Sequence, residues 1–231
     1  MKIFTPAAII ILVVLIEFYF DITNGNNIGL KLYILCGYIV LGGSSKYIDE
    51  AYDESIFDKR IALFLAAISM FLLVSLVLID YISGIIFIAV AVGLLAAGKI
   101  DNLIFRLLTV SILISALLRL LFYPFAIDFS SLSTWLFVFI VIALASFVDE
   151  WLNDFSDRNK KSLHFVLKVI FHNRLVTKIT ILLFCVLGHK PNLYFYAFLG
   201  FDAAYSLIDN LADKVKQKIL RAKQNALYLP R

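Results

Sequence analysis

Two acidic segments of the chain have the residue types and the spacing that suit a divalent cation. The first contains Asp49, Glu50 and Asp53, and the second contains Glu150 and Asp154. Residues three or four apart share a face of a helix, so each segment would present carboxylates together. Such a pair holds Mg²⁺ incompletely and leaves room for water and for phosphate oxygens. The predicted metal ligands are Asp49, Glu50, Asp53, Asp149, Glu150 and Asp154.

Basic residues follow both acidic segments. Cations in these positions would bind phosphate oxygens and stabilise the charge of a departing diphosphate. The alternative interpretation is that the acidic residues are solvated helix ends, paired with the nearby cations. The predicted diphosphate-binding residues are Lys59, Arg60, Arg158, Lys160 and Lys161.

The elements that must position these residues are apolar helices. Of the 231 residues, 62% are hydrophobic and 16% are charged, whereas soluble domains are about a quarter charged. A membrane span needs roughly 20 mostly apolar residues, and unsatisfied backbone groups in lipid favour helices. We expect an all-α membrane protein with about eight transmembrane helices. The predicted spans are 7–22, 28–45, 61–80, 83–98, 103–122, 132–148, 175–189 and 191–208.

The basic residues predict the orientation of these spans. All but three of the 21 Lys and Arg residues fall on the side that holds both termini, the exceptions being Lys31, Arg119 and Lys190. The positive-inside rule therefore predicts an integral protein of the cell membrane with both termini cytoplasmic. The net charge of +4 is then explained by topology, and nucleic acid is not an expected partner. The first span resembles a signal peptide in length, but we retain it as a helix because no small-residue cleavage site follows it.

The same order of elements, two helices with an acidic segment and then two helices with an Asp-Asn pair, occurs twice along the chain. The Asp-Glu pair recurs, and an Ile-Asp-Asn triplet appears at 100–102 and again at 208–210. We interpret this as a tandem duplication of a four-helix unit; chance similarity of short motifs is the alternative. The predicted parts are a first repeat over 1–102 with an acidic loop at 46–60, a second repeat over 103–213 with an acidic loop at 147–174, and a basic cytoplasmic tail over 214–231 that contacts anionic membrane lipids.

In this layout the chain resembles the UbiA-type intramembrane prenyltransferase superfamily, which has acidic motifs behind its second and sixth helices. Asp49 stands at the asparagine of the first family motif, followed by Glu50 and by Asp53. Glu150 and Asp154 match the second motif, with Asp149 as an alternative first ligand. The chain departs from the family in Asp49, Glu50 and Glu150, which replace other residues, and in the missing ninth helix.

The resemblance implies a function and a set of roles. The activity would be Mg²⁺-dependent transfer of a prenyl group from an isoprenoid diphosphate to a lipophilic acceptor. The residues that the resemblance makes catalytic are Asp49, Asp53, Glu150 and Asp154. Two other functions remain open at this point: a divalent-cation transporter and a non-catalytic lipid-binding membrane protein.

Three features outside the acidic segments lead to further predictions. Asp202 lies inside the last predicted span, where burial of a carboxylate is costly, and it shares a helix face with Asp209. Asp202 motivates the transporter alternative. Gly42 and the following glycine should allow close helix packing. Asp80, at the opposite ends of the helices, is expected to have no part in the site.

Overall fold

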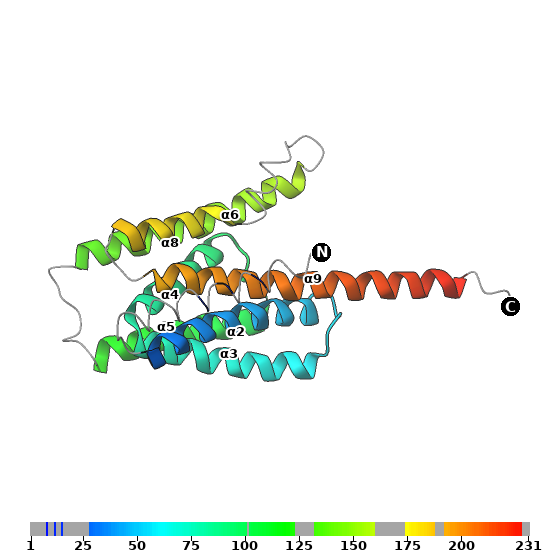
Figure 1. Cartoon of the computed structure of the whole chain (residues 1–231), viewed down its shortest axis with the longest axis horizontal. Helices are drawn as coiled ribbons and strands as arrows, with labels where there is room; N and C mark the ends of the chain where they lie inside the picture. The colour runs from blue at the N-terminus through cyan, green and yellow to red at the C-terminus, as the bar shows by residue number, and fades with distance from the viewer. Residues whose placement is uncertain are drawn as a thin grey trace. The chain divides into compact units, whose positions relative to one another are not determined.

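The structure is a computed structural model that describes residues 8, 12, 15, 28–100, 102–122, 132–159, 174–187 and 192–227. This part of the chain is helical and contains no strand (Figure 1). Its helices are α2 (Ile28–Tyr52), α3 (Lys59–Ile79), α4 (Tyr81–Ala96), α5 (Leu103–Phe122), α6 (Leu132–Arg158), α8 (Leu175–Leu187) and α9 (Leu193–Leu227).

Four of these helices are long and apolar enough to cross a membrane. They are Ile28–Tyr52, Lys59–Ile79, Leu103–Phe122 and Ser133–Ser156, while α4 and α8 are shorter apolar helices. Large apolar side chains such as Phe71 and Phe122 are about 70% exposed, which suits contact with lipid. The prediction of an all-α membrane protein is confirmed at this level.

The predicted spans agree with the described helices except at three ends. The span expected over 28–45 continues as helix to Tyr52, the span expected over 132–148 continues to Arg158, and the span expected over 191–208 continues to Leu227. Hydrophobicity marks the part of a helix that suits lipid, whereas the helix itself continues into polar sequence. Both Asp-Glu pairs therefore lie on helical turns. The span predicted over 7–22 falls outside the described residues except at residues 8, 12 and 15.

By their contacts, the residues group into two units. Unit 1 comprises Met1–Ser69 and Tyr196–Arg231, and unit 2 comprises Met70–Phe195. The predicted repeat boundary at residue 102 falls inside unit 2.

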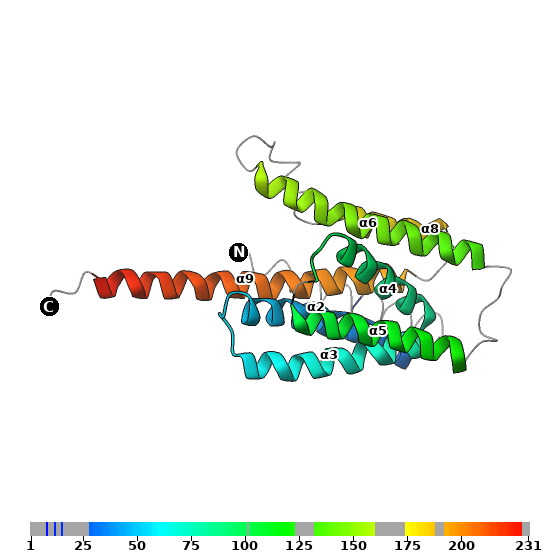
Figure 2. The same ribbon diagram turned by 180° about the vertical axis from the view of Figure 1, so that it is seen from behind.

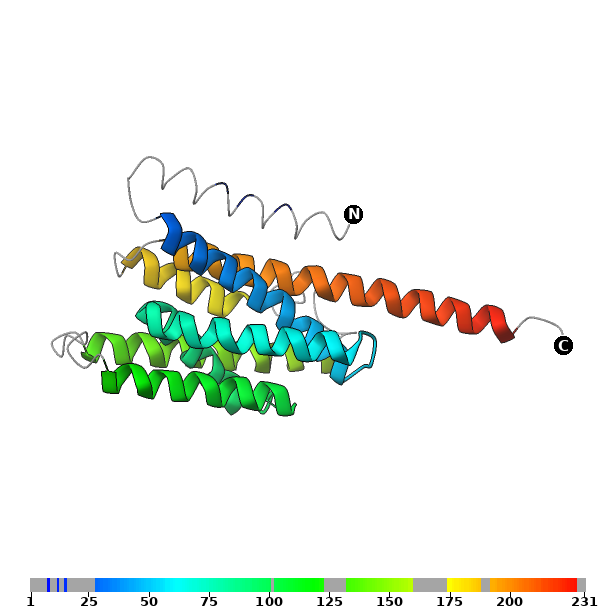
Figure 3. The same cartoon turned by 90° about the horizontal axis from the view of Figure 1, so that it is seen from below.

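In unit 1, α2 lies beside α9 (Figure 3). Gly42 of α2 lies directly against the backbone of Phe201 of α9, where no room is left for a Cβ atom. Between α2 and α3, the buried hydroxyls of Ser44 and Ser69 are 2.7 Å apart and hydrogen-bonded. These small residues allow close approach of the helices, as the glycine pair predicted.

In unit 2, α4 packs against both α5 and α6, and α6 packs against α8 (Figure 2). The close approach of α4 to α6 depends on Gly93, because a Cβ there would lie 2.7 Å from the Cβ of Ser146. After α4, Gly98 has φ of +70°, the left-handed conformation that commonly ends a helix.

Asp80 has a structural role in unit 2 that the sequence did not reveal. Its buried carboxylate accepts a hydrogen bond from the backbone N–H of Ser83 at 2.9 Å, and so caps α4. It also accepts one from the hydroxyl of Tyr194 at 3.0 Å. Substitution of Asp80 would therefore disturb the fold of unit 2.

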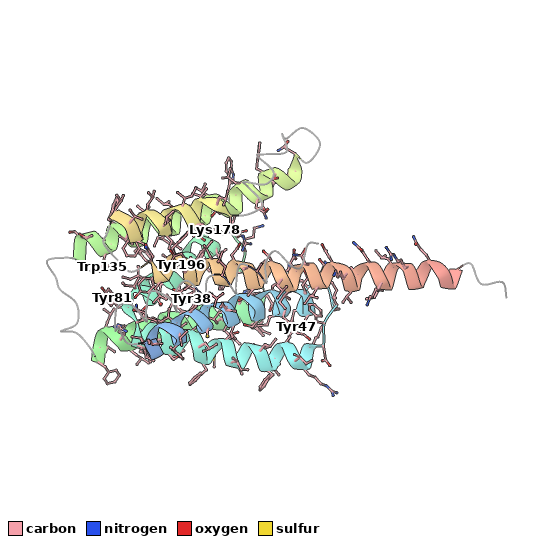
Figure 4. The ribbon with its side chains drawn as sticks, viewed as in Figure 1. Tyr38, Tyr47, Tyr81, Trp135, Lys178 and Tyr196 are labelled. Atoms are coloured by element: carbon pink, nitrogen blue, oxygen red, sulfur yellow. The ribbon has the colours of Figure 1, made fainter. Side chains whose placement is uncertain are left out.

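Aromatic residues lie near the start of α6, and charged residues lie near its end. Trp135, near its start, packs edge to face on Tyr81, with ring centroids 5.1 Å apart (Figure 4). Asp154 follows 19 residues later, which corresponds to about 28 Å along a helix. Aromatic residues are enriched at membrane interfaces, and the hydrocarbon core is about 30 Å thick. This spacing suits a helix that crosses a bilayer.

Candidate functional site

At the charged end of unit 1, Lys46 joins α2 to α9. Its Nζ atom lies 3.1 Å from Asp49 Oδ2, 2.8 Å from Glu50 Oε1 and 3.0 Å from Asp209 Oδ1. The Lys46 side chain is 12% exposed and the Glu50 side chain only 3%. Asp49 and Glu50 follow Lys46 at helical spacing, whereas Asp209 arrives from α9 through tertiary packing.

A second ammonium group extends these contacts. Lys216 Nζ lies 3.3 Å from Glu50 Oε2 and 2.8 Å from Glu54 Oε2. Partial burial lowers the pKa of Lys216, but its ion pairs with Glu54 and Glu50 raise the pKa more, so that it lies above the ordinary value of lysine. Lys216 is therefore positively charged at neutral pH.

These ion pairs define the α2–α9 charge cluster, in which four carboxylates surround two ammonium groups. The cluster carries four negative and two positive charges, which leaves a net charge of −2. Its members are Lys46, Asp49, Glu50, Glu54, Asp209 and Lys216.

Aromatic rings lie beside the cations of unit 1. The Lys46 ammonium is 5.4 Å from the ring centroid of Tyr205, and that of Lys59 is 5.6 Å from the ring centroid of Tyr52. Tyr47, labelled in Figure 4, stacks on Phe57 with ring centroids 4.4 Å apart. Both distances from cation to ring are within the range of cation–π attraction.

In unit 2, Asp149 binds the start of α8. Its two carboxylate oxygens accept hydrogen bonds from the backbone N–H groups of Val176, at 3.0 Å, and Thr177, at 2.7 Å. The first N–H groups of a helix have no partner within it, so the buried Asp149 supplies the cap from another helix.

Glu150 fixes the residue that precedes α8. Its carboxylate, 4% exposed, forms an ion pair with Arg174 at 2.8 Å. Arg174 has φ of +48°, a left-handed conformation that costs about 1–2 kcal/mol for such a residue. The second Asp-Glu pair thus holds both the position and the first turn of α8.

Asp154 lies further along α6 and is more accessible. It forms an ion pair with Lys99 at 2.6 Å, and both side chains are more than a third exposed. An exposed pair of this kind contributes only about 0–1 kcal/mol to stability. Asp154 can therefore change partners at little cost, unlike Asp149.

The other predicted site residues lie at the surface. Asp53, directly after α2, and the predicted phosphate-binding residues Lys59, Arg60 and Arg158 are exposed. Lys160 and Lys161 lie outside the described residues.

As the side chains stand, the described residues contain no group of three or more His, Cys, Asp or Glu side chains that could hold a metal ion. In unit 1, an ammonium group occupies the point where three carboxylates converge. A Mg²⁺ ion that takes most of its ligands from water and phosphate oxygens fits the more exposed Asp53 in unit 1, or Asp154 in unit 2, better.

The basic partners of the acidic residues are the part of the site that the sequence prediction missed. Lys46 carried a signal, because it precedes Asp49 by three residues and Glu50 by four, the spacing of helical ion pairs. Arg174 and Lys216 carried none, since they are distant in sequence from the carboxylates that they contact.

Comparison of the chain with protein-family models, with curated proteins and with solved structures finds no match.

Proposed function

We propose that the chain is a magnesium-dependent intramembrane prenyltransferase, which transfers a prenyl group from an isoprenoid diphosphate to a lipophilic acceptor. The observation that carries this proposal is the net charge of −2 in the α2–α9 charge cluster. An excess of carboxylates over ammonium groups near helix ends attracts a divalent cation, which can in turn hold a diphosphate. The adjoining apolar helices suit a ligand with a long hydrocarbon chain.

The proposal gives the exposed residues the contacts with the ligand. Asp53 in unit 1 and Asp154 in unit 2 would each be a ligand of Mg²⁺. The ion would supply positive charge that neutralises a departing diphosphate. Lys59, Arg60 and Arg158 would bind phosphate oxygens, and apolar helix walls would keep water from the reacting carbon. An eight-helix, UbiA-like bundle of two repeats with both termini cytoplasmic belongs to the same proposal.

Metal-dependent ligand binding is the first test. Purified protein is expected to bind labelled geranylgeranyl diphosphate, or a shorter prenyl diphosphate, with Mg²⁺ and not with EDTA. Asp53→Asn and Asp154→Asn are each expected to weaken binding about tenfold or more, because each removes one charged metal ligand. Equilibrium binding in a neutral detergent measures this, and release of diphosphate with mixed lipid acceptors then tests for the reaction.

Asp213→Asn provides the matched control, because Asp213 is an exposed carboxylate on α9. It should leave the affinity unchanged. Binding that does not depend on metal, or no binding at all, would contradict the prenyltransferase proposal.

One observation favours a second candidate, a non-catalytic lipid-binding membrane protein. Glu50, Asp149 and Glu150 are each at most 4% exposed and already have partners within the chain. Carboxylates used in this way stabilise the packing of helices without any reaction. Prenyl diphosphate binding without release of diphosphate under any acceptor condition would support this candidate. Divalent-cation flux into liposomes that fails with Asp202→Asn would instead support a transporter.

A further inference from the structure

Helix α9 runs parallel to α2 and continues beyond its end. A Cβ atom at Gly43 would lie 3.8 Å from Ala204, and further along both helices Lys216 binds Glu54. Helix α2 ends just before Glu54, whereas α9 continues as a helix, of which residues 211–227 form the α9 stem (Figure 3). Because α2 is apolar enough to cross a membrane, the α9 stem extends from that membrane into water.

The α9 stem has an apolar face. Leu211, Val215 and Ile219 follow one another at four-residue spacing, so they share one face of the helix. Leu211 is 38% exposed and Ile219 is 44% exposed, while Leu220, the next residue in the chain, is 59% exposed. An exposed apolar face on a helix in water is typical of a surface that packs on another molecule.

Basic residues flank this apolar face. Lys214 and Lys218 directly precede Val215 and Ile219, so they lie along one edge of the face. From residue 214 to residue 231 the sequence has six Lys and Arg residues and no Asp or Glu. In a pair of copies of this chain, basic flanks would therefore meet basic flanks, and such like charges disfavour pairing. A complementary surface must be acidic.

Two other occupants fit less well. The segment 160–173 of the same chain has basic residues but no acidic ones. An anionic membrane surface has the right charge, but Lys218 follows Asp209 by nine residues, about 14 Å along a helix. The surface potential of a membrane decays within a Debye length, about 8 Å at physiological salt. A helix bound to lipid lies in the plane of the interface, whereas the α9 stem continues in the direction of α2.

We propose that the α9 stem is a docking surface for an acidic amphipathic helix of another protein. The partner helix would place its own apolar residues, spaced three and four apart, on Leu211, Val215 and Ile219. Its Asp and Glu residues would pair with Lys214 and Lys218 at the edge of the contact. The proposal concerns binding alone and does not depend on the proposed transferase activity.

Peptide binding by the full chain tests this proposal. The chain is placed in nanodiscs of phosphatidylcholine, without Mg²⁺ or prenyl diphosphate. The probe is a fluorescent synthetic helix of 21 residues, an arbitrary length of about three heptads, with leucines spaced three and four apart and glutamates on both flanks. Fluorescence anisotropy is expected to show saturable binding of one peptide per chain. A scrambled peptide of the same composition, and a peptide with lysine for glutamate, should each bind at least about tenfold more weakly.

Substitutions on the α9 stem locate the binding surface. Ile219→Gln is expected to weaken binding at least about tenfold, because it removes an apolar contact from the centre of the face. Lys218→Glu with Arg221→Glu should weaken binding of the acidic peptide and strengthen binding of the lysine peptide. Gln217→Ala, at an exposed position on the opposite face, should change neither. All these positions are exposed, so circular dichroism should show unchanged unfolding midpoints.

Hydrogen exchange distinguishes the other occupants. The acidic peptide is expected to slow amide exchange in the α9 stem, whereas phosphatidylserine added to the nanodiscs should not. Slower exchange with phosphatidylserine would overturn the proposal in favour of a lipid surface. A dimer in detergent that Ile219→Gln dissociates would overturn it in favour of a second copy. Failure of the folded, unaltered protein to bind the acidic peptide, or equal binding of the scrambled peptide, would also overturn it.

Discussion

Gly42→Ala is expected to destabilise unit 1 strongly, although it adds a single methyl group. The new Cβ would overlap backbone atoms of Phe201, including its carbonyl carbon and Cα. Backbone cannot move aside as the end of a side chain can, so α9 must shift away from α2. Overpacking of this kind costs about 1–3 kcal/mol or more, and at about 2–4 °C per kcal/mol for a chain of this length the midpoint of thermal unfolding should fall by roughly 2–12 °C. Circular dichroism in detergent measures the change.

The next residue offers a matched control. A Cβ at Gly43 would lie 3.7 Å from Ile208 and 3.8 Å from Ala204, which is ordinary contact with side chains. Gly43→Ala should be neutral, or stabilising by up to about 1 kcal/mol, because alanine favours the helix more than glycine does. Equal midpoints for the two variants would contradict the close approach of α2 and α9.

The apolar runs of the sequence predicted the described helices well, and the reason is physical. A lipid-facing helix needs a long apolar surface, so α5 was predicted at its observed bounds, Leu103–Phe122. Helix ends were harder to predict, because hydrophobicity does not report where a helix stops in polar sequence. For this reason the ends of α2 and α6, which carry both Asp-Glu pairs, were expected to be loops and are helical.

The candidate site was predictable in its residue types but not in its partners. Spacing alone predicts that Asp49 and Glu50 lie together, and this holds in α2. It does not distinguish a carboxylate that binds metal from one that binds an ammonium group or a helix start. That distinction depends on Asp209 and on α8, which only tertiary packing brings to these positions. The magnesium site and the prenyl transfer therefore stay predictions.

Asp149→Ala separates the structural interpretation of the second Asp-Glu pair from the metal-binding one. The substitution removes both acceptors from the first turn of α8 and leaves the N–H groups of Val176 and Thr177 without them. A donor left without a partner inside the protein costs about 1–3 kcal/mol, so the loss of both hydrogen bonds should cost about 2–6 kcal/mol in total. Asp149→Asn keeps one acceptor oxygen and should lose less.

Asp154→Ala, on the same helix, is the comparison variant for Asp149→Ala. Its exposed ion pair with Lys99 predicts a change in stability of at most about 1 kcal/mol. The expected pattern is thus opposite for the two carboxylates: Asp149 governs the midpoint of thermal unfolding, and Asp154 governs Mg²⁺-dependent binding of prenyl diphosphate. If Asp149→Ala unfolds like the unaltered protein but loses metal-dependent binding, then Asp149 is a metal ligand. Its hydrogen bonds to α8 would in that case contribute little to the fold.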